Sequence, residues 1–94
     1  MEANIEIAQS LFKQSKYLET INTCNQILIN NHNSIEVLKL IAKSFLATRQ
    51  IDDARIYFNK VLEIQPDDYE VIKDLGNTYQ AVGDINNAKN YYQK

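Results

Sequence analysis

The strongest constraint on the fold of this chain is an internal repeat. The steps from Ala8 to Ala42 and from Ala42 to Gly76 are both 34 residues, and at this step small residues align with small residues and large with large. The aligned columns are Ile7, Ile41 and Leu75; Ala8, Ala42 and Gly76; Leu11, Phe45 and Tyr79; Tyr17, Ile51 and Ile85; Thr20, Ala54 and Ala88; and Cys24, Phe58 and Tyr92. A unit of this length buries its apolar residues mainly against its neighbours, so the sequence predicts a linear stack of units.

Each unit contains two stretches of helical periodicity. Apolar residues recur at steps of three and four, as on one face of an α-helix, and the alternation typical of strands is absent. In the second unit Leu38, Ile41 and Phe45 form one stripe, while Ala54 and Phe58 belong to the other. The expected fold is therefore all-α, with helices near residues 2–14, 17–30, 35–48, 51–64, 68–82 and 85–94.

Several of these helices have start and stop signals. Gly83 followed by Asp84 is typical of a helix end and a new N-cap, and Pro66 is placed to end the preceding helix. Two further starts combine a capping residue with an acid three positions later, a variant of the capping box; the pairs are Asn33 with Glu36 and Asp67 with Glu70.

This pattern resembles the tetratricopeptide repeat, whose helix-turn-helix unit carries W-x2-L-G-x2-Y, then A-x3-F, then P. The third unit matches with Ile72, Leu75, Gly76, Tyr79, Ala88 and Tyr92, and the second with Leu38, Ile41, Ala42, Phe45, Ala54, Phe58 and Pro66. The first is degenerate and has His32 where proline is usual. The resemblance implies one domain over residues 1–94, with units 1–34, 35–68 and a truncated 69–94. It also implies a right-handed superhelical solenoid of antiparallel helix pairs.

Charge and hydropathy narrow the classes of partner. Ten Lys and Arg against twelve Asp and Glu give a net charge of -2, with no basic stripe to neutralise phosphates, so we expect no nucleic-acid partner. No apolar run approaches the length of a membrane span, and the first residues lack the basic region of a signal peptide. We therefore expect a soluble cytoplasmic protein without a membrane partner.

Residues that could support catalysis have simpler explanations. The pairs Asp52-Asp53 and Asp67-Asp68 fall at predicted helix starts, where carboxylates favour the positive end of the helix dipole. His32 lies in a polar connection, and Cys24 shares a core column with Phe58 and Tyr92. One cysteine and one histidine make no soft-ligand set for zinc. We predict no enzyme, no cofactor and no metal site.

The resemblance implies a binding surface. Relatives usually bind peptides on the concave face, which is lined by the first helix of each unit. The matching candidates here are Ile5, Gln9, Phe12, Lys39, Leu40, Lys43, Leu46, Lys73 and Asn77. Ile5, Phe12, Leu40 and Leu46 are expected to contact apolar groups of the ligand, and the lysines an acid on it. An alternative stays open, in which these four apolar residues pack against their own neighbouring helices.

The predicted function is a protein-protein interaction scaffold that binds a peptide or partner helix on its concave face. Two alternatives remain. Family arrays generally end in a polar capping helix, whereas this sequence stops inside the second helix of its third unit. The chain could therefore be a self-association module that forms homo-oligomers through the uncapped C-terminal helix. It could equally be the excised N-terminal array of a larger protein, including a transferase.

Overall fold

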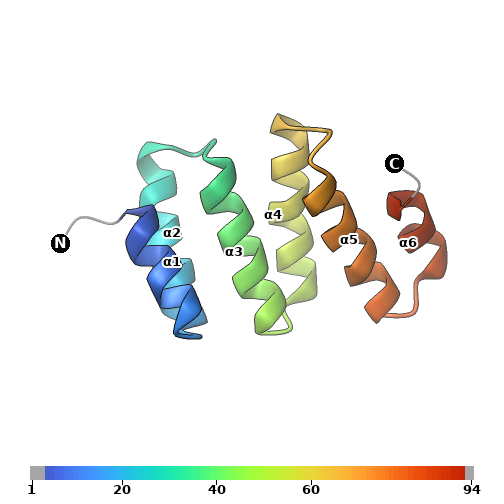
Figure 1. Cartoon of the computed structure of the whole chain (residues 1–94), viewed down its shortest axis with the longest axis horizontal. Helices are drawn as coiled ribbons and strands as arrows, with labels where there is room; N and C mark the ends of the chain where they lie inside the picture. The colour runs from blue at the N-terminus through green and yellow to red at the C-terminus, as the bar shows by residue number, and fades with distance from the viewer. Residues whose placement is uncertain (1–3, 93–94) are drawn as a thin grey trace.

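The computed structural model describes residues 4–92, which form α-helices joined by short connections (Figure 1). The helices are α1 (Ile5–Lys13), α2 (Tyr17–Asn30), α3 (Ile35–Ala47), α4 (Ile51–Ile64), α5 (Tyr69–Ala81) and α6 (Ile85–Tyr92). The all-α prediction is confirmed, and α2 and α4 have the predicted bounds. The predicted helix ends at residues 2–3 and 93–94 lie outside the described part of the chain.

Two of the predicted capping residues are displaced by one position, although α3 begins at residue 35 as predicted. The N-caps of α3 and α5 are Ser34 and Asp68, not Asn33 and Asp67. The carboxylate of Asp68 accepts a hydrogen bond from the backbone N–H of Val71 at 3.2 Å, whereas Ser34 makes no side-chain capping bond. The predicted pairs of Asn33 with Glu36 and of Asp67 with Glu70 therefore do not start at the observed N-caps. The start at Asp84 is confirmed, because its carboxylate accepts from the N–H of Asn87 at 3.2 Å.

The turn inside each unit repeats with the same period as the sequence. Ser15, Arg49 and Gly83, spaced by 34 residues, adopt φ values of 61°, 63° and 80°. The following N–H closes the turn on a carbonyl five residues earlier, as from Asp84 to Tyr79 at 2.8 Å. This is the Schellman ending, which favours a left-handed residue after the helix. The three units therefore share one backbone turn, although only the third supplies glycine.

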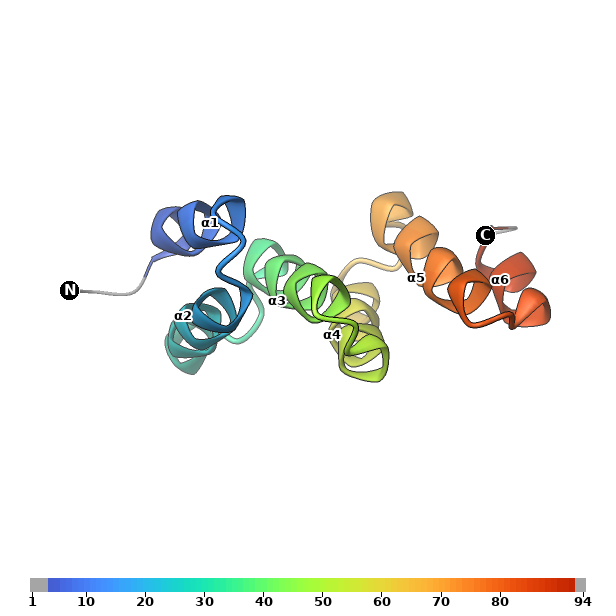
Figure 2. The same cartoon turned by 90° about the horizontal axis from the view of Figure 1, so that it is seen from below.

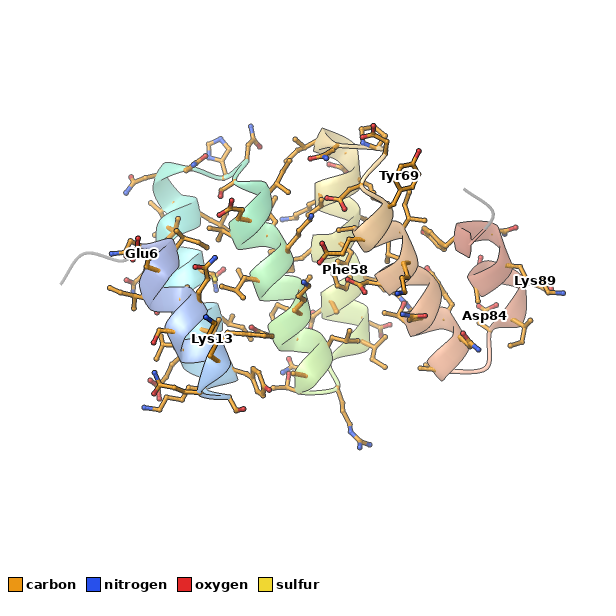
Figure 3. The ribbon with its side chains drawn as sticks, viewed as in Figure 1. Glu6, Lys13, Phe58, Tyr69, Asp84 and Lys89 are labelled. Carbon is orange, nitrogen blue, oxygen red and sulfur yellow. The ribbon has the colours of Figure 1, made fainter. Side chains whose placement is uncertain are left out.

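Two clusters of buried side chains hold the stack together. The central cluster joins α3, α4 and α5 and contains Leu38, Ala42, Ala54, Phe58, Val61, Val71 and Leu75. The N-terminal cluster joins α1, α2 and α3 and contains Ala8, Cys24, Val37 and Ile41. Phe58, labelled in Figure 3, is fully buried in the central cluster. Because α3 contributes to both clusters, it links the first unit to the rest.

The stacked helices form two layers. Seen from below, α1, α3 and α5 lie in one layer and α2 and α4 in the other (Figure 2). The first layer is curved rather than flat. In this view α3 lies lower than α1 on one side and the start of α5 on the other. The molecule is elongated, with extents of 45 × 25 × 17 Å. The first helices of the three units therefore lie on the same side of the stack.

Candidate partner-binding surface

The candidate surface is the side of α1, α3 and α5 that faces away from α2 and α4, and is called the inner face below (Figure 2). All nine sequence-predicted site residues belong to these three helices. They are Ile5, Gln9 and Phe12 on α1, Lys39, Leu40, Lys43 and Leu46 on α3, and Lys73 and Asn77 on α5. Glu6 and Lys13 lie toward opposite ends of α1 (Figure 3). The predicted site residues are thus distributed over the first helix of each unit.

The four apolar candidates are all partly buried. Leu46 packs against the central cluster, while Ile5 and Leu40 pack against the N-terminal cluster. The ring of Phe12 meets that of Tyr17 edge to face, with 5.5 Å between centroids. These side chains therefore contribute to the packing of their own helices and keep part of their apolar surface exposed.

Two of the three candidate lysines are paired within the chain. Lys39 Nζ lies 2.6 Å from Asp68 Oδ2 and 3.7 Å from Glu70 Oε2, and Lys43 Nζ lies 2.6 Å from Glu70 Oε1. These ion pairs connect α3 to the start of α5. Among residues 4–92, Lys73 has no ion pair within 4 Å, and its side chain is exposed. Lys39 and Lys43 are therefore paired within the chain, and the contact of the lysines with an acid on the ligand stays a prediction.

The electrostatics of this network favour its charged forms. Burial raises the pKa of the Asp68 carboxyl, but hydrogen bonds from Lys39 and from the N–H of Val71 outweigh burial, so the pKa lies below its ordinary value. The hydrogen bond to Asp68 raises the pKa of Lys39 despite partial desolvation. The hydrogen bond from Lys43 lowers the pKa of Glu70. The network therefore favours the charged forms of Asp68, Lys39 and Glu70.

Asp74 on α5, like the exposed Glu36 on α3, is a carboxylate without an ion pair among the described residues. Its side chain is partly buried, and no ion-pair partner lies within 4 Å of it among residues 4–92. Burial raises the pKa of its carboxyl, and the more distant charges of Lys43 and Lys73 offset this only in part. Asp68, Glu70 and Asp74 are not among the nine predicted site residues. No local sequence pattern shows that Asp68 and Glu70 pair with Lys39 and Lys43 of α3.

Four of the residues weighed for catalysis lie outside α1, α3 and α5, namely Cys24, His32, Asp52 and Asp53. Cys24 is free and fully buried, and burial raises its pKa to about 12. His32 is exposed in the connection between α2 and α3, and Asp52 and Asp53 lie in the first turn of α4. In the described part of the chain no three His, Cys, Asp or Glu side chains are grouped to hold a metal ion. None of the helices between residues 4 and 92 has the length and apolar character to cross a membrane.

Comparisons with known proteins agree with the repeat. A solved structure described as the crystal structure of MamA superposes with a TM-score of 0.88 at 15% sequence identity, and the match covers 92% of this chain. This chain spans half the length of that one, since 50% of it is covered. The comparison with curated proteins finds no match.

The sequence profile of the tetratricopeptide repeat matches residues 34–68 and 74–94. The first match coincides with the complete unit made by α3 and α4, and the second covers most of the unit made by α5 and α6. More than half of the chain is matched, and the superposition with MamA shows the same all-α architecture. The chain therefore belongs to the tetratricopeptide repeat family.

Proposed function

We propose that this chain is a protein-binding scaffold that holds a peptide or a partner helix on its inner face. The observation that carries the proposal is the row of partly exposed apolar side chains along α1 and α3, namely Ile5, Phe12, Leu40 and Leu46. Large apolar groups that remain open to water on one helix layer are typical of surfaces that meet another protein. Tetratricopeptide repeats generally mediate protein-protein interactions, which supports the same function.

The arrangement of α1, α3 and α5 supports one mode of ligand binding. An extended peptide or an amphipathic helix laid across α1, α3 and α5 would contact successive units with successive apolar side chains. Exposed polar groups such as Gln9 would border these contacts and contribute less to affinity. We assign no catalytic step and no cofactor to this surface.

The setting that we propose is the cytoplasm. Cys24 is a free thiol in the middle of the N-terminal cluster, and a reducing compartment keeps such thiols free. Burial also raises the pKa of Cys24 to about 12, which disfavours the nucleophilic thiolate and supports a packing role for it.

The test begins with peptides recovered from a phage-displayed random library on the immobilised chain. Each is titrated into the labelled protein, and backbone amide chemical shifts are followed by NMR. We expect the largest shifts along the inner side of α1, α3 and α5. Shifts confined to exposed residues of α2, α4 and α6, or a failure to recover any peptide that binds in solution, would overturn the proposal.

A matched pair of variants separates binding from stability. Leu46 and Leu62 are both partly buried against the central cluster, but Leu46 lies on α3 and Leu62 on α4. Leu46→Ala and Leu62→Ala are both expected to lower the melting temperature, because both remove core contacts. Only Leu46→Ala should also weaken peptide binding per folded molecule, by roughly tenfold. Equal affinities for the two variants would remove Leu46 from the site.

A further inference from the structure

We infer that the segment bound on the inner face carries a basic side chain, arginine or lysine, that pairs with Asp74 beside apolar side chains that contact Leu40 and Leu46. This inference rests on the proposed function and adds the charge of the partner to it. It reverses the sequence-based expectation that the lysines of this surface meet an acid.

The first argument is that Lys39 and Lys43 already form ion pairs within the chain. Lys39 and Lys43 each lie 2.6 Å from a carboxylate oxygen, of Asp68 and Glu70 respectively. The Asp68 side chain is only 6% exposed. An acidic ligand that drew Lys39 toward itself would leave this carboxylate buried without its cation, which is unfavourable. The network therefore resists an acidic partner.

The second argument is the state of Asp74. This carboxylate is partly desolvated by its surroundings, yet the nearby Lys43 is bound to Glu70. A cation brought by a ligand would meet a carboxylate that has lost some of its water and has no competing ion pair in the chain. Burial raises the pKa of Asp74, which is consistent with a carboxylate that is not stabilised by its own protein.

The third argument is the sum of charges around α3 and α5. Together, α3, α5 and the N-cap Asp68 carry four carboxylates and three lysines; the groups are Glu36, Asp68, Glu70 and Asp74, and Lys39, Lys43 and Lys73. The patch is therefore negative by one charge. Lys73 is the lysine without an ion pair among the described residues, and its exposure leaves it well solvated, so it repels a basic ligand weakly.

The experiment uses the same phage-displayed random library, and affinities are measured by fluorescence anisotropy on synthetic copies of the recovered peptides. Asp74→Asn removes the charge with little change in shape. Asp53→Asn is the control, since Asp53 is an exposed carboxylate on α4 and makes the same change in net charge. Lys43→Gln removes the nearer of the two lysines paired with Glu70 and makes the patch more negative. Circular dichroism melting checks that all three variants are folded.

We expect recovered peptides that combine arginine or lysine with large apolar residues. Asp74→Asn should weaken their binding about tenfold, Lys43→Gln should strengthen it about threefold, and Asp53→Asn should leave it unchanged at low salt. Replacing the basic residue of the peptide by glutamine should make Asp74→Asn silent.

The contrary outcomes are distinguishable. Peptides that shift inner-face amides but are acidic or uncharged, or that bind Asp74→Asn as well as wild type, would overturn this inference and leave the proposed function standing. If the Lys43→Gln variant bound the recovered peptides more weakly than wild type, an acidic partner would be favoured instead. If no recovered peptide shifts inner-face amides, the proposed function fails and this inference fails with it.

Discussion

Asp68 stabilises the start of α5 in two separable ways. One carboxylate oxygen caps the helix by accepting from the N–H of Val71, and the other lies 2.6 Å from Lys39 of the preceding unit. Asp68→Asn keeps a good capping group but removes the charge, so we expect a loss of about 1 kcal/mol in the free energy of unfolding. Asp68→Ala also removes the cap and should lose about 1 kcal/mol more. Urea titrations of the three proteins measure this, and equal losses would show that the cap contributes nothing.

The same ion pair predicts how stability depends on pH. The pKa of Asp68 is lowered in the folded protein from its ordinary value of 3.8, so its stabilising effect is present above that value and is lost as pH falls through the folded pKa. Glu70 acts with the same sign. Wild type should therefore lose more stability than Asp68→Asn on acidification from about pH 6 to about pH 2. Parallel curves for the two proteins would exclude Asp68 as the source.

The shared turn predicts opposite effects of glycine substitution in two units. Arg49 adopts a φ of 63° that costs an L-residue energy, so Arg49→Gly should raise stability by about 0.5 kcal/mol. Gly83 has a φ of 80°, and a Cβ added there would meet no atom within 4 Å. Gly83→Ala should therefore lower stability by about 1 kcal/mol through backbone strain alone. Thermal melting tests both, and a loss in Arg49→Gly would point instead to contacts of its side chain.

At the scale of elements, the junction between α4 and α5 is closed by Arg55. Its Nε donates to Thr78 Oγ1 at 3.0 Å and its Nη2 to the carbonyl of Thr78 at 3.1 Å. The guanidinium also lies over the ring of Tyr79, with 3.9 Å between Cζ and the ring centroid. Tyr79 in turn stacks on Tyr91 of α6 at 5.4 Å between centroids. One side chain of α4 therefore connects to both helices of the third unit.

Removing this connection should loosen the third unit first. We expect Arg55→Met to lower the free energy of unfolding by about 1 to 3 kcal/mol, because it leaves the buried Thr78 with fewer partners. Hydrogen exchange should accelerate in α5 and α6 more than in α1 and α2. Lys60→Met is the control, since Lys60 is exposed and lies 4.9 Å from the ring of Tyr57. A uniform acceleration over all helices in Arg55→Met would contradict the local role.

These elements differ in how far the sequence predicted them. The helices follow from apolar residues three and four apart, a local signal, and were placed within a few residues. The periodicity does not determine which residue caps the helix. The ion pair with Lys39 helps fix Asp68 at the N-cap of α5 instead of Asp67. The Arg55 junction was not predicted, because it joins residues 23 positions apart through side-chain geometry.

In the candidate site too, the sequence pattern predicted the helices that carry the residues but not the contacts between their side chains. The repeat placed all nine candidate residues on α1, α3 and α5, since each column of the repeat keeps its side of the helix. The charge state of the surface could not be read from the same columns. The pair of Lys43 with Glu70 spans 27 positions and depends on the approach of α5 to α3. A list of charges along one face therefore does not show which lysines form ion pairs within the folded chain.

At the scale of the whole molecule, α3 contributes to both buried clusters. We therefore expect unfolding to begin in other helices. Val37 and Ile41 of α3 belong to the N-terminal cluster, while Leu38 and Ala42 belong to the central cluster. In α6, by contrast, Ala88 is buried and Ile85 is 50% exposed. A linear stack exchanges stability only between neighbours, so its least covered helices open first.

Native-state hydrogen exchange in low urea should reveal this order. We expect amides of α3 and α4 to exchange only through global unfolding, because the central cluster must open with them. Amides of α1 and α6, the shortest helices with 9 and 8 residues, should exchange through local openings of lower free energy and little urea dependence. Ile41→Ala, which removes a fully buried side chain of α3, should lower the free energy of unfolding by about 2 to 5 kcal/mol and bring all helices toward one common exchange rate. If α6 proved as protected as α3 in wild type, the stack would unfold as one cooperative unit and α3 would have no special position in it.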